Sequence, residues 1–167
     1  MAEDNMDRII STLEDEDKIY KKLLSLSIKK KDHIIEGRIS ELDQIVQIES
    51  SIILEISKLE DEREAAIDAL AADHELLREN LTVSYICDEV KDERCSILKE
   101  VTQSISDTLS KLKEVNDING KLIEQSLEYI NFSVNLITNS LEPHNGVYEA
   151  KTGEDKGEKH SLFDAKV

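Results

Sequence analysis

The sequence is poor in the residues that form sharp turns. Its 167 residues include one proline and five glycines, and aromatic residues make up 4%. Hairpins and the corners of β-sheets need turn residues at short intervals, so their scarcity argues against a β-rich fold. The chain is instead rich in Ile, Leu, Glu, Lys and Ser, and its length fits one domain of roughly 100–200 residues. We therefore expect an all-α protein.

Basic residues are also in short supply. The chain has 21 Lys and Arg against 37 Asp and Glu, which gives a formal net charge of −16. Nucleic acid and anionic membrane surfaces would both repel it, so neither is expected as a partner. The apolar runs are too short to cross a bilayer, and the acidic start MAEDNMDRII has no signal-peptide pattern. These features predict a cytoplasmic protein without membrane insertion.

The residues that carry catalytic or metal chemistry are few and scattered. Cys87 and Cys95 would lie about 12 Å apart along one helix, too far for a disulfide, so we expect two reduced thiols. None of the four histidines has another His or Cys at i+3 or i+4. A di-iron bundle would need two E-x-x-H pairs, and phosphate-loop and nucleophile motifs are missing from the sequence. We expect no enzyme, no metal site and no cofactor.

Apolar residues recur at helical spacing in the N-terminal part of the chain. The spacing predicts a first helix over about 6–36, followed by Gly37 as the residue that tolerates the left-handed conformation at a helix end. The apolar positions that carry this prediction are Ile9, Leu13, Tyr20, Leu24, Ile28 and Ile35.

A second helix is indicated by two rows with a seven-residue repeat, as in a coiled coil. One row is Leu42, Glu49, Ile56, Arg63 and Leu70, and the other is Ile45, Ile52, Leu59 and Ala66. Ile48, Ile53 and Ile67 are expected to widen this stripe, as in a helical bundle.

The pattern weakens around 71–82, where we expect a short helix through Leu76, Leu77 and Leu81 and then a break. A last long helix is predicted from the mid-eighties to Leu141, ended by Pro143. The fold class is thus an elongated antiparallel bundle of three long helices and one short helix over residues 1–142. Residues 143–167 have too few large apolar residues to fold alone and are expected to form a flexible tail.

The last predicted helix is apolar on more than one face beyond Gly120. One row consists of Leu122, Tyr129 and Leu136, and the second consists of Ile123, Leu127, Ile130, Val134, Ile137 and Leu141. One row can be buried in the bundle, and an exposed row of this size is typical of a protein-binding surface. The alternatives are that another helix covers it or that two copies of the chain pair there.

Three segments of the chain resemble the FlgN family. The first is the run from KIYKKLL to LEDERE over residues 18–64, and the last is Val147–Tyr148, then Gly153 and the end LFDAKV. The middle one is similar to the family's N-x-x-N-x-x-L-hydrophobic-x-x-S-L-x-Y-I segment and consists of Asn116, Asn119, Leu122, Ile123, Ser126, Leu127, Tyr129 and Ile130. The related chaperone FliT is generally shorter and lacks such a tail.

The resemblance implies a cytosolic flagellar type III export chaperone. Such a protein would bind the C-terminal segments of the hook-associated proteins FlgK and FlgL, prevent their premature assembly and deliver them to the export gate protein FlhA. The client-binding residues would be Leu122, Ile123, Leu127, Tyr129, Ile130, Val134 and Ile137. Tyr148 would dock on the gate.

A second function class fits the same heptads. A structural or adaptor coiled-coil protein would self-associate through its C-terminal helix. A stable high-order oligomer would favour that class, whereas a monomer or weak homo-oligomer would favour the chaperone.

Overall fold

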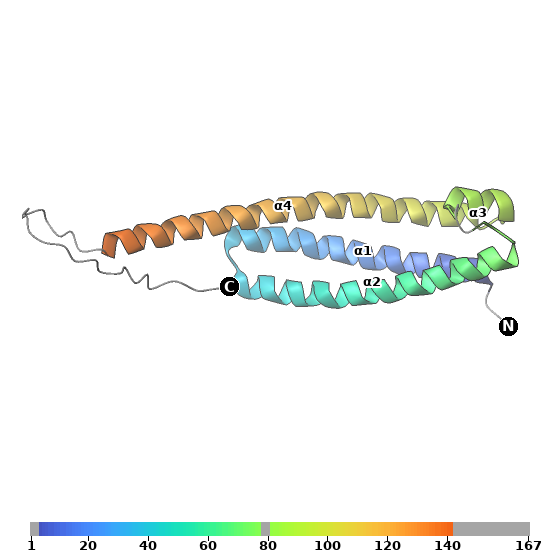
Figure 1. The fold of residues 1–167 in the computed structure, drawn as a ribbon, viewed down its shortest axis with the longest axis horizontal. Helices are drawn as coiled ribbons and strands as arrows, with labels where there is room; N and C mark the ends of the chain where they lie inside the picture. Colours follow the sequence, from blue (N-terminus) through green and yellow to red (C-terminus); the bar gives the residue numbers. More distant parts are fainter. Residues whose placement is uncertain (1–3, 78–80, 142–167) are drawn as a thin grey trace, which may run out of the picture. The chain divides into compact units, whose positions relative to one another are not determined.

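The computed structural model describes residues 4–77 and 81–141, and these form four helices (Figure 1). The helices are α1 (Asn5–Glu36), α2 (Ile39–Asp73), α3 (Val83–Val90) and α4 (Cys95–Leu141). No described residue lies in a strand. The prediction of an all-α fold with three long helices and one short helix is confirmed. The predicted tail, residues 143–167 with Tyr148, lies outside the described residues.

The chain divides into two compact units, residues 1–130 and residues 131–167. The first holds α1, α2, α3 and most of α4. The described part of the second is the last stretch of α4, residues 131–141.

The first helix begins and ends where its capping residues lie. The Asp4 carboxylate accepts a hydrogen bond from the backbone N–H of Met6 at 3.2 Å and so caps the N-terminus. Gly37 has φ 68° and donates its N–H to the Ile34 carbonyl, which ends the helix in the left-handed conformation. The predicted helix and its glycine stop are confirmed.

Polar contacts show that α1 and α2 are antiparallel. Asn5 contacts Asp73, Tyr20 contacts Glu60 and Lys30 contacts Glu49. The residue number on α2 falls as the number on α1 rises, so the two helices run in opposite directions from the turn at Gly37. Figure 1 shows them side by side.

The last helix runs parallel to α1. Asp17 accepts a hydrogen bond from the Ser104 hydroxyl at 2.9 Å, and Ser27 accepts one at its carbonyl from the Asn119 amide at 2.9 Å. These partners are separated by 87 and 92 positions. Because the difference in residue number between the partners is nearly constant, α1 and α4 run in the same direction. The end of α1 therefore lies beside residues 122–130 of α4.

The main apolar core lies where all four helices meet. Its buried members come from α1, α2, α3 and α4: Met6, Ile9, Ile10, Leu13, Ala66, Leu70, Ile86, Cys87, Leu98 and Ile105. They gather near the start of α1 and the start of α4. Toward the end of α1, the described part of the bundle consists of the three long helices without α3.

The buried face of α1 differs from the predicted one. Ile28 and Ile35 are exposed, whereas Ser27 and Ile34 are buried. A row that steps by seven residues, Met6, Leu13, Tyr20, Ser27 and Ile34, is buried at four of its five positions, and Ile9, Ile10, Thr12 and Glu16 are buried beside it. A coiled-coil seam keeps this 3.5-residue period, so a polar residue on the row is buried and an apolar residue beside it is not.

On α2 the two predicted rows are confirmed at Ile45, Ile52, Ile56, Ala66 and Leu70, all of which are buried. The expected widening of the stripe is wrong at two positions. Ile48 is 42% exposed and Ile53 is 58% exposed, because the bundle has no further helix to cover the flanks of α2.

The short helix lies later than predicted. α2 ends at Asp73, and the next helix begins only at Val83, after Thr82 caps it by accepting the N–H of Tyr85. Lys91 then takes a left-handed conformation with φ 52° and ends α3. The predicted start of the last helix in the mid-eighties is therefore wrong, and α4 begins at Cys95. Capping residues of this kind are polar, so the spacing of the apolar residues does not reveal them.

The two cysteines lie on different helices rather than on one. Cys87 is on α3, Cys95 begins α4, and both are free thiols. Burial raises the pKa of the Cys87 thiol to about 11, with its contact to Cys95 adding to the rise. The group is therefore neutral at physiological pH and behaves as a core residue.

Candidate functional site

Burial along α4 stops part-way along the helix. Leu112 and Asn119 are buried and Leu122 is half-buried, but the apolar residues that follow are exposed. In the first unit these are Ile123, Leu127, Tyr129 and Ile130, between 41% and 72% exposed. In the second unit they are Phe132, Val134, Leu136 and Ile137, between 48% and 61% exposed.

So much exposed apolar surface has an energetic consequence. Burying one such side chain fully contributes about 1.5–3 kcal/mol, so half-covering four of them contributes on the order of several kcal/mol. Exposed apolar side chains gathered along one helix are typical of surfaces that bind another protein.

An open groove of about 560 Å³ lies between the end of α1 and α4. Its lining from α4 is Leu122, Gln125, Ser126, Tyr129 and Ile130, and its lining from α1 and the turn is Ile34, Ile35, Glu36 and Gly37. Three of the predicted client-binding residues therefore share one groove with the exposed side chain of Ile35.

A second hollow, of about 310 Å³, lies where the three long helices meet. Ile123 lines it from α4 and Ile53 lines it from α2. Leu23, Ser27 and Lys30 contribute from α1. Each of the three helices thus contributes both an apolar and a polar side chain to its wall, with Glu49 on α2 and Asn116 and Asn119 on α4 as polar members.

Polar side chains join the three helices beside this second hollow. Ser27 is 1% exposed, and its hydroxyl donates to Asn116 Oδ1 at 3.1 Å. Asn119 is 3% exposed and donates its amide N–H to the Ser27 carbonyl. Lys30 Nζ and Glu49 Oε2 pair at 2.8 Å with both side chains at most 20% exposed. This cluster, the polar junction, holds α1, α2 and α4 in register.

Sequence analysis missed the polar junction on α1. It followed the apolar residues to Ile28 and so passed over Ser27. The seven-residue step from Met6 through Leu13 and Tyr20 contains Ser27 and would have placed it inside. The same step from Ile9 reaches Glu16, which is also buried.

The predicted client-binding residues fall into distinct places. Leu122, Tyr129 and Ile130 line the groove beside α1, and Ile123 lines the hollow at the polar junction. Leu127 is 54% exposed and lines neither of these two. Val134 and Ile137 are exposed in the second unit.

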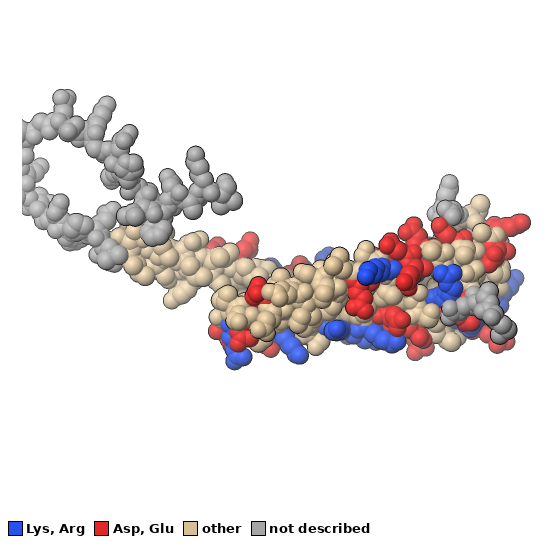
Figure 2. Space-filling view, turned by 90° about the horizontal axis from the view of Figure 1, so that it is seen from below, with Lys and Arg blue, Asp and Glu red and all other residues tan. Residues whose placement is uncertain are grey.

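Charge is unevenly distributed over the first unit. Figure 2 shows charged side chains of both signs over the end that carries α3, whereas on the other half of this face an uncharged area is bordered by basic side chains. On α4 the only charged residues between Lys121 and Leu141 are Glu124 and Glu128. The apolar grooves thus lie in the least charged part of the helix.

Within residues 4–77 and 81–141, no group of three His, Cys, Asp or Glu side chains could hold a metal ion. Among the helices described, none combines the length and the apolar character needed to cross a membrane. The groove between the end of α1 and α4 has a largely apolar lining, which suits a polypeptide better than a small charged molecule.

The fold defines a helical-bundle protein whose last helix carries exposed apolar residues. The model of the FlgN protein family matches residues 1–156, nearly the whole chain. The chain therefore belongs to the FlgN family. Because proteins of this family are flagellar export chaperones, membership assigns the chain to that chaperone class and to flagellar protein partners.

A relative with a similar sequence is the uncharacterized protein YvyG of Bacillus subtilis strain 168. It is 28% identical over 149 residues, which cover 89% of this chain and 91% of that protein. No solved structure matches the chain.

Proposed function

We propose that this protein binds the C-terminal segments of the hook-associated proteins FlgK and FlgL and keeps them from assembling before export. The observation that carries the proposal is the exposed apolar surface of α4, where burial ends at Asn119 and four large side chains follow. A chaperone for a helix-forming segment needs such a surface, and an amphipathic helix would present anchors at i, i+3, i+4 and i+7 to it. Family membership supplies the flagellar context.

The proposed client-binding residues are those predicted from the sequence, with Val134 and Ile137 extending the surface along α4. Tyr148 is proposed as the contact to the export gate protein FlhA, which would let the gate engage the chaperone while the client is held. The protein would act in the cytoplasm and without catalysis.

A purely structural coiled coil is less well supported. The strict heptad positions Leu98, Ile105 and Leu112 are buried inside this chain's own bundle, so they are not available to a second copy. On α4, most of the exposed large apolar side chains lie beyond Asn119, and this stretch is short for a stable two-stranded coil.

The experiment is titration calorimetry with a C-terminal peptide of FlgK or FlgL from the same organism. We expect a Leu127→Asp/Ile130→Asp variant to lose at least about 100-fold in affinity, since two apolar contacts are replaced by buried charges. The control Leu54→Asp/Ile97→Asp changes two exposed apolar residues elsewhere and should bind normally. Tyr148→Ala should keep the peptide and lose FlhA. Equal affinities of the two Asp variants would contradict the client surface.

A further inference from the structure

The flank of α2 carries an exposed apolar row of its own. Ile39, Val46 and Ile53 are spaced by seven residues and are 72%, 47% and 58% exposed. Seven-residue spacing keeps them on one face of the helix, beside the buried core positions. An exposed row next to a buried row is the pattern of a helix that contacts two neighbours.

This row meets α4 at the hollow of about 310 Å³. Ile53 and Glu49 line the hollow from α2, while Ile123, Asn116 and Asn119 line it from α4. Side chains of α1 complete the lining. A helix laid between α2 and α4 would therefore contact all three long helices and become the fourth member of the bundle.

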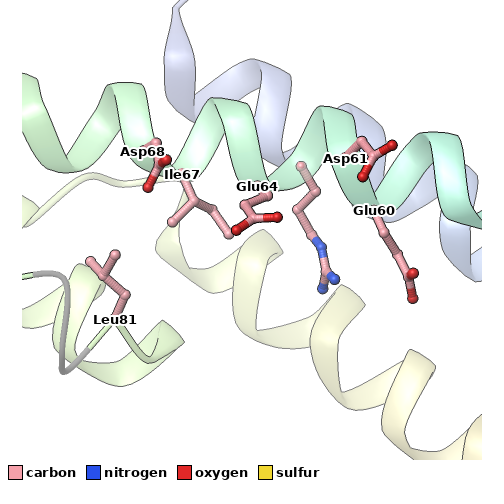
Figure 3. A pocket seen from close by; sticks show the side chains of 7 residues that line it. Glu60, Asp61, Glu64, Ile67, Asp68 and Leu81 are labelled. Carbon is pink, nitrogen blue, oxygen red and sulfur yellow. The ribbon is translucent and has the colours of Figure 1, made fainter.

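Farther along α2, the same face becomes acidic. Glu60 and Glu64 follow Ile53 by seven and eleven positions. With Asp61 and Asp68 they line a further hollow, of about 640 Å³, which is separate from the two described above. Figure 3 shows Glu60, Glu64 and Ile67 projecting from α2 on the side of α4. Arg63 also lines the hollow, but its guanidinium is paired with the buried Glu16 at 3.2 Å. This hollow, which residues of α2 and Leu81 line, therefore has an excess of negative charge.

We propose that the client helix lies in the groove between α2 and α4, with an apolar stripe on Ile53 and Ile123 and with Lys or Arg side chains opposite Glu60 and Glu64. At 1.5 Å per residue, the acidic positions lie about 10–16 Å from Ile53, so the client's basic residues follow its apolar stripe by two to three turns. The acidic wall selects a cationic partner and repels a second copy of this −16 chain. This inference rests on the proposed function and adds α2 as the second wall of the site.

The test is binding of the same FlgK and FlgL peptides to the full chain by calorimetry, with two matched pairs of variants. Ile53→Asp is compared with Leu54→Asp, since the neighbouring Leu54 is 67% exposed and lies outside both hollows. Glu60→Gln/Glu64→Gln is compared with Glu55→Gln/Glu62→Gln, which removes the same charge from another part of α2. Glutamine keeps an acceptor for the Tyr20 hydroxyl that Glu60 holds.

We expect Ile53→Asp to weaken binding at least about 10-fold and Leu54→Asp to leave it unchanged. Glu60→Gln/Glu64→Gln should weaken binding about 5–10-fold at low salt, and the loss should shrink at high salt because the pairs are solvent-accessible. Equal effects within each pair, with the wild-type chain still binding, would overturn the α2–α4 groove and leave the proposed function standing.

If neither peptide binds the wild-type chain, the proposed function itself fails, and this inference fails with it. Light scattering of the chain alone tests whether a second copy of the chain occupies the groove. A dimer that Ile53→Asp dissociates would mean that a second copy fills the groove, which would also overturn the proposal.

Discussion

A buried ion pair between α1 and α2 should make the bundle sensitive to one substitution at Arg63. Glu16 is 1% exposed, and its Oε1 lies 3.2 Å from Nε of Arg63. Burial raises the pKa of the Glu16 carboxyl, while the positive charge of Arg63 opposes that rise. Replacing Arg63 with Met keeps much of the apolar stem but leaves the carboxylate in the core without its cation.

The magnitude follows from the burial of the two partners. Removing one member of a fully buried pair costs about 3–5 kcal/mol. Because the Arg63 side chain is 36% exposed, water screens part of this pair, and we expect a loss of about 2–3 kcal/mol for Arg63→Met. The double variant Glu16→Met/Arg63→Met should recover to within about 1 kcal/mol of the wild type, since no charge remains buried.

The loss should depend on pH in a defined direction. A carboxyl with a raised pKa in the folded state destabilises the fold at pH values above that pKa, where it must be ionised. The penalty is relieved as the pH falls through the folded pKa toward the ordinary value of 4.5. The deficit of Arg63→Met should therefore shrink between neutral pH and about pH 5.

Urea unfolding followed by far-UV circular dichroism at two pH values measures these differences. Lys58→Met is the control, because Lys58 is an exposed cation on the same helix. If Arg63→Met were no more destabilising than Lys58→Met, or if its deficit grew on acidification, the interpretation of Glu16 as a buried charge would be refuted.

Two further predictions concern the ends of helices. Arg94 lowers the pKa of Asp92 to about 2 through a side-chain hydrogen bond, so this carboxylate stabilises the fold above its ordinary pKa of 3.8 and the effect is lost as the pH falls toward 2. Asp92→Asn should cost about 1 kcal/mol in urea unfolding at pH 7, and a cost that persisted at pH 2 would contradict the assignment. Gly37→Ala should cost about 1 kcal/mol because φ is 68° there, whereas the helical Gly120→Ala should stabilise by about 0.5–1 kcal/mol, since an added Cβ meets nothing within 4 Å at either position. Melting temperatures that moved in the same direction for both glycine variants would refute this.

Local signals in the sequence were enough for the class of fold and for the long helices. A seven-residue apolar repeat and a glycine that tolerates positive φ act within a few residues, so the bounds of α1 and the two rows of α2 could be predicted. An exposed apolar surface on α4 could be predicted as well, because two apolar faces on one helix exceed what a three-helix bundle can cover. The expectation that one of the two rows is buried is wrong beyond the half-buried Leu122, since Tyr129 and Leu136 of that row are 72% and 54% exposed.

The capping residues that bound α3 could not be identified from the sequence pattern. Thr82 begins α3 by accepting a backbone N–H, and Lys91 ends it in a left-handed conformation. Their role as caps depends on backbone conformation and hydrogen bonding, which the spacing of apolar residues does not reveal. The position of the short helix was therefore open until the chain was folded.

The sequence by itself determined that this chain forms long helices with apolar rows, since hydrophobic periodicity is a property of each segment alone. Only the tertiary structure decided what the buried polar residues contact. Ser27, which the seven-residue step places inside, is satisfied there by Asn116 and Asn119 of α4, whereas the neighbouring Ile28 is exposed. The pairing of Ile53 on α2 with Ile123 on α4 around one hollow is likewise a consequence of helix register, which no local pattern encodes.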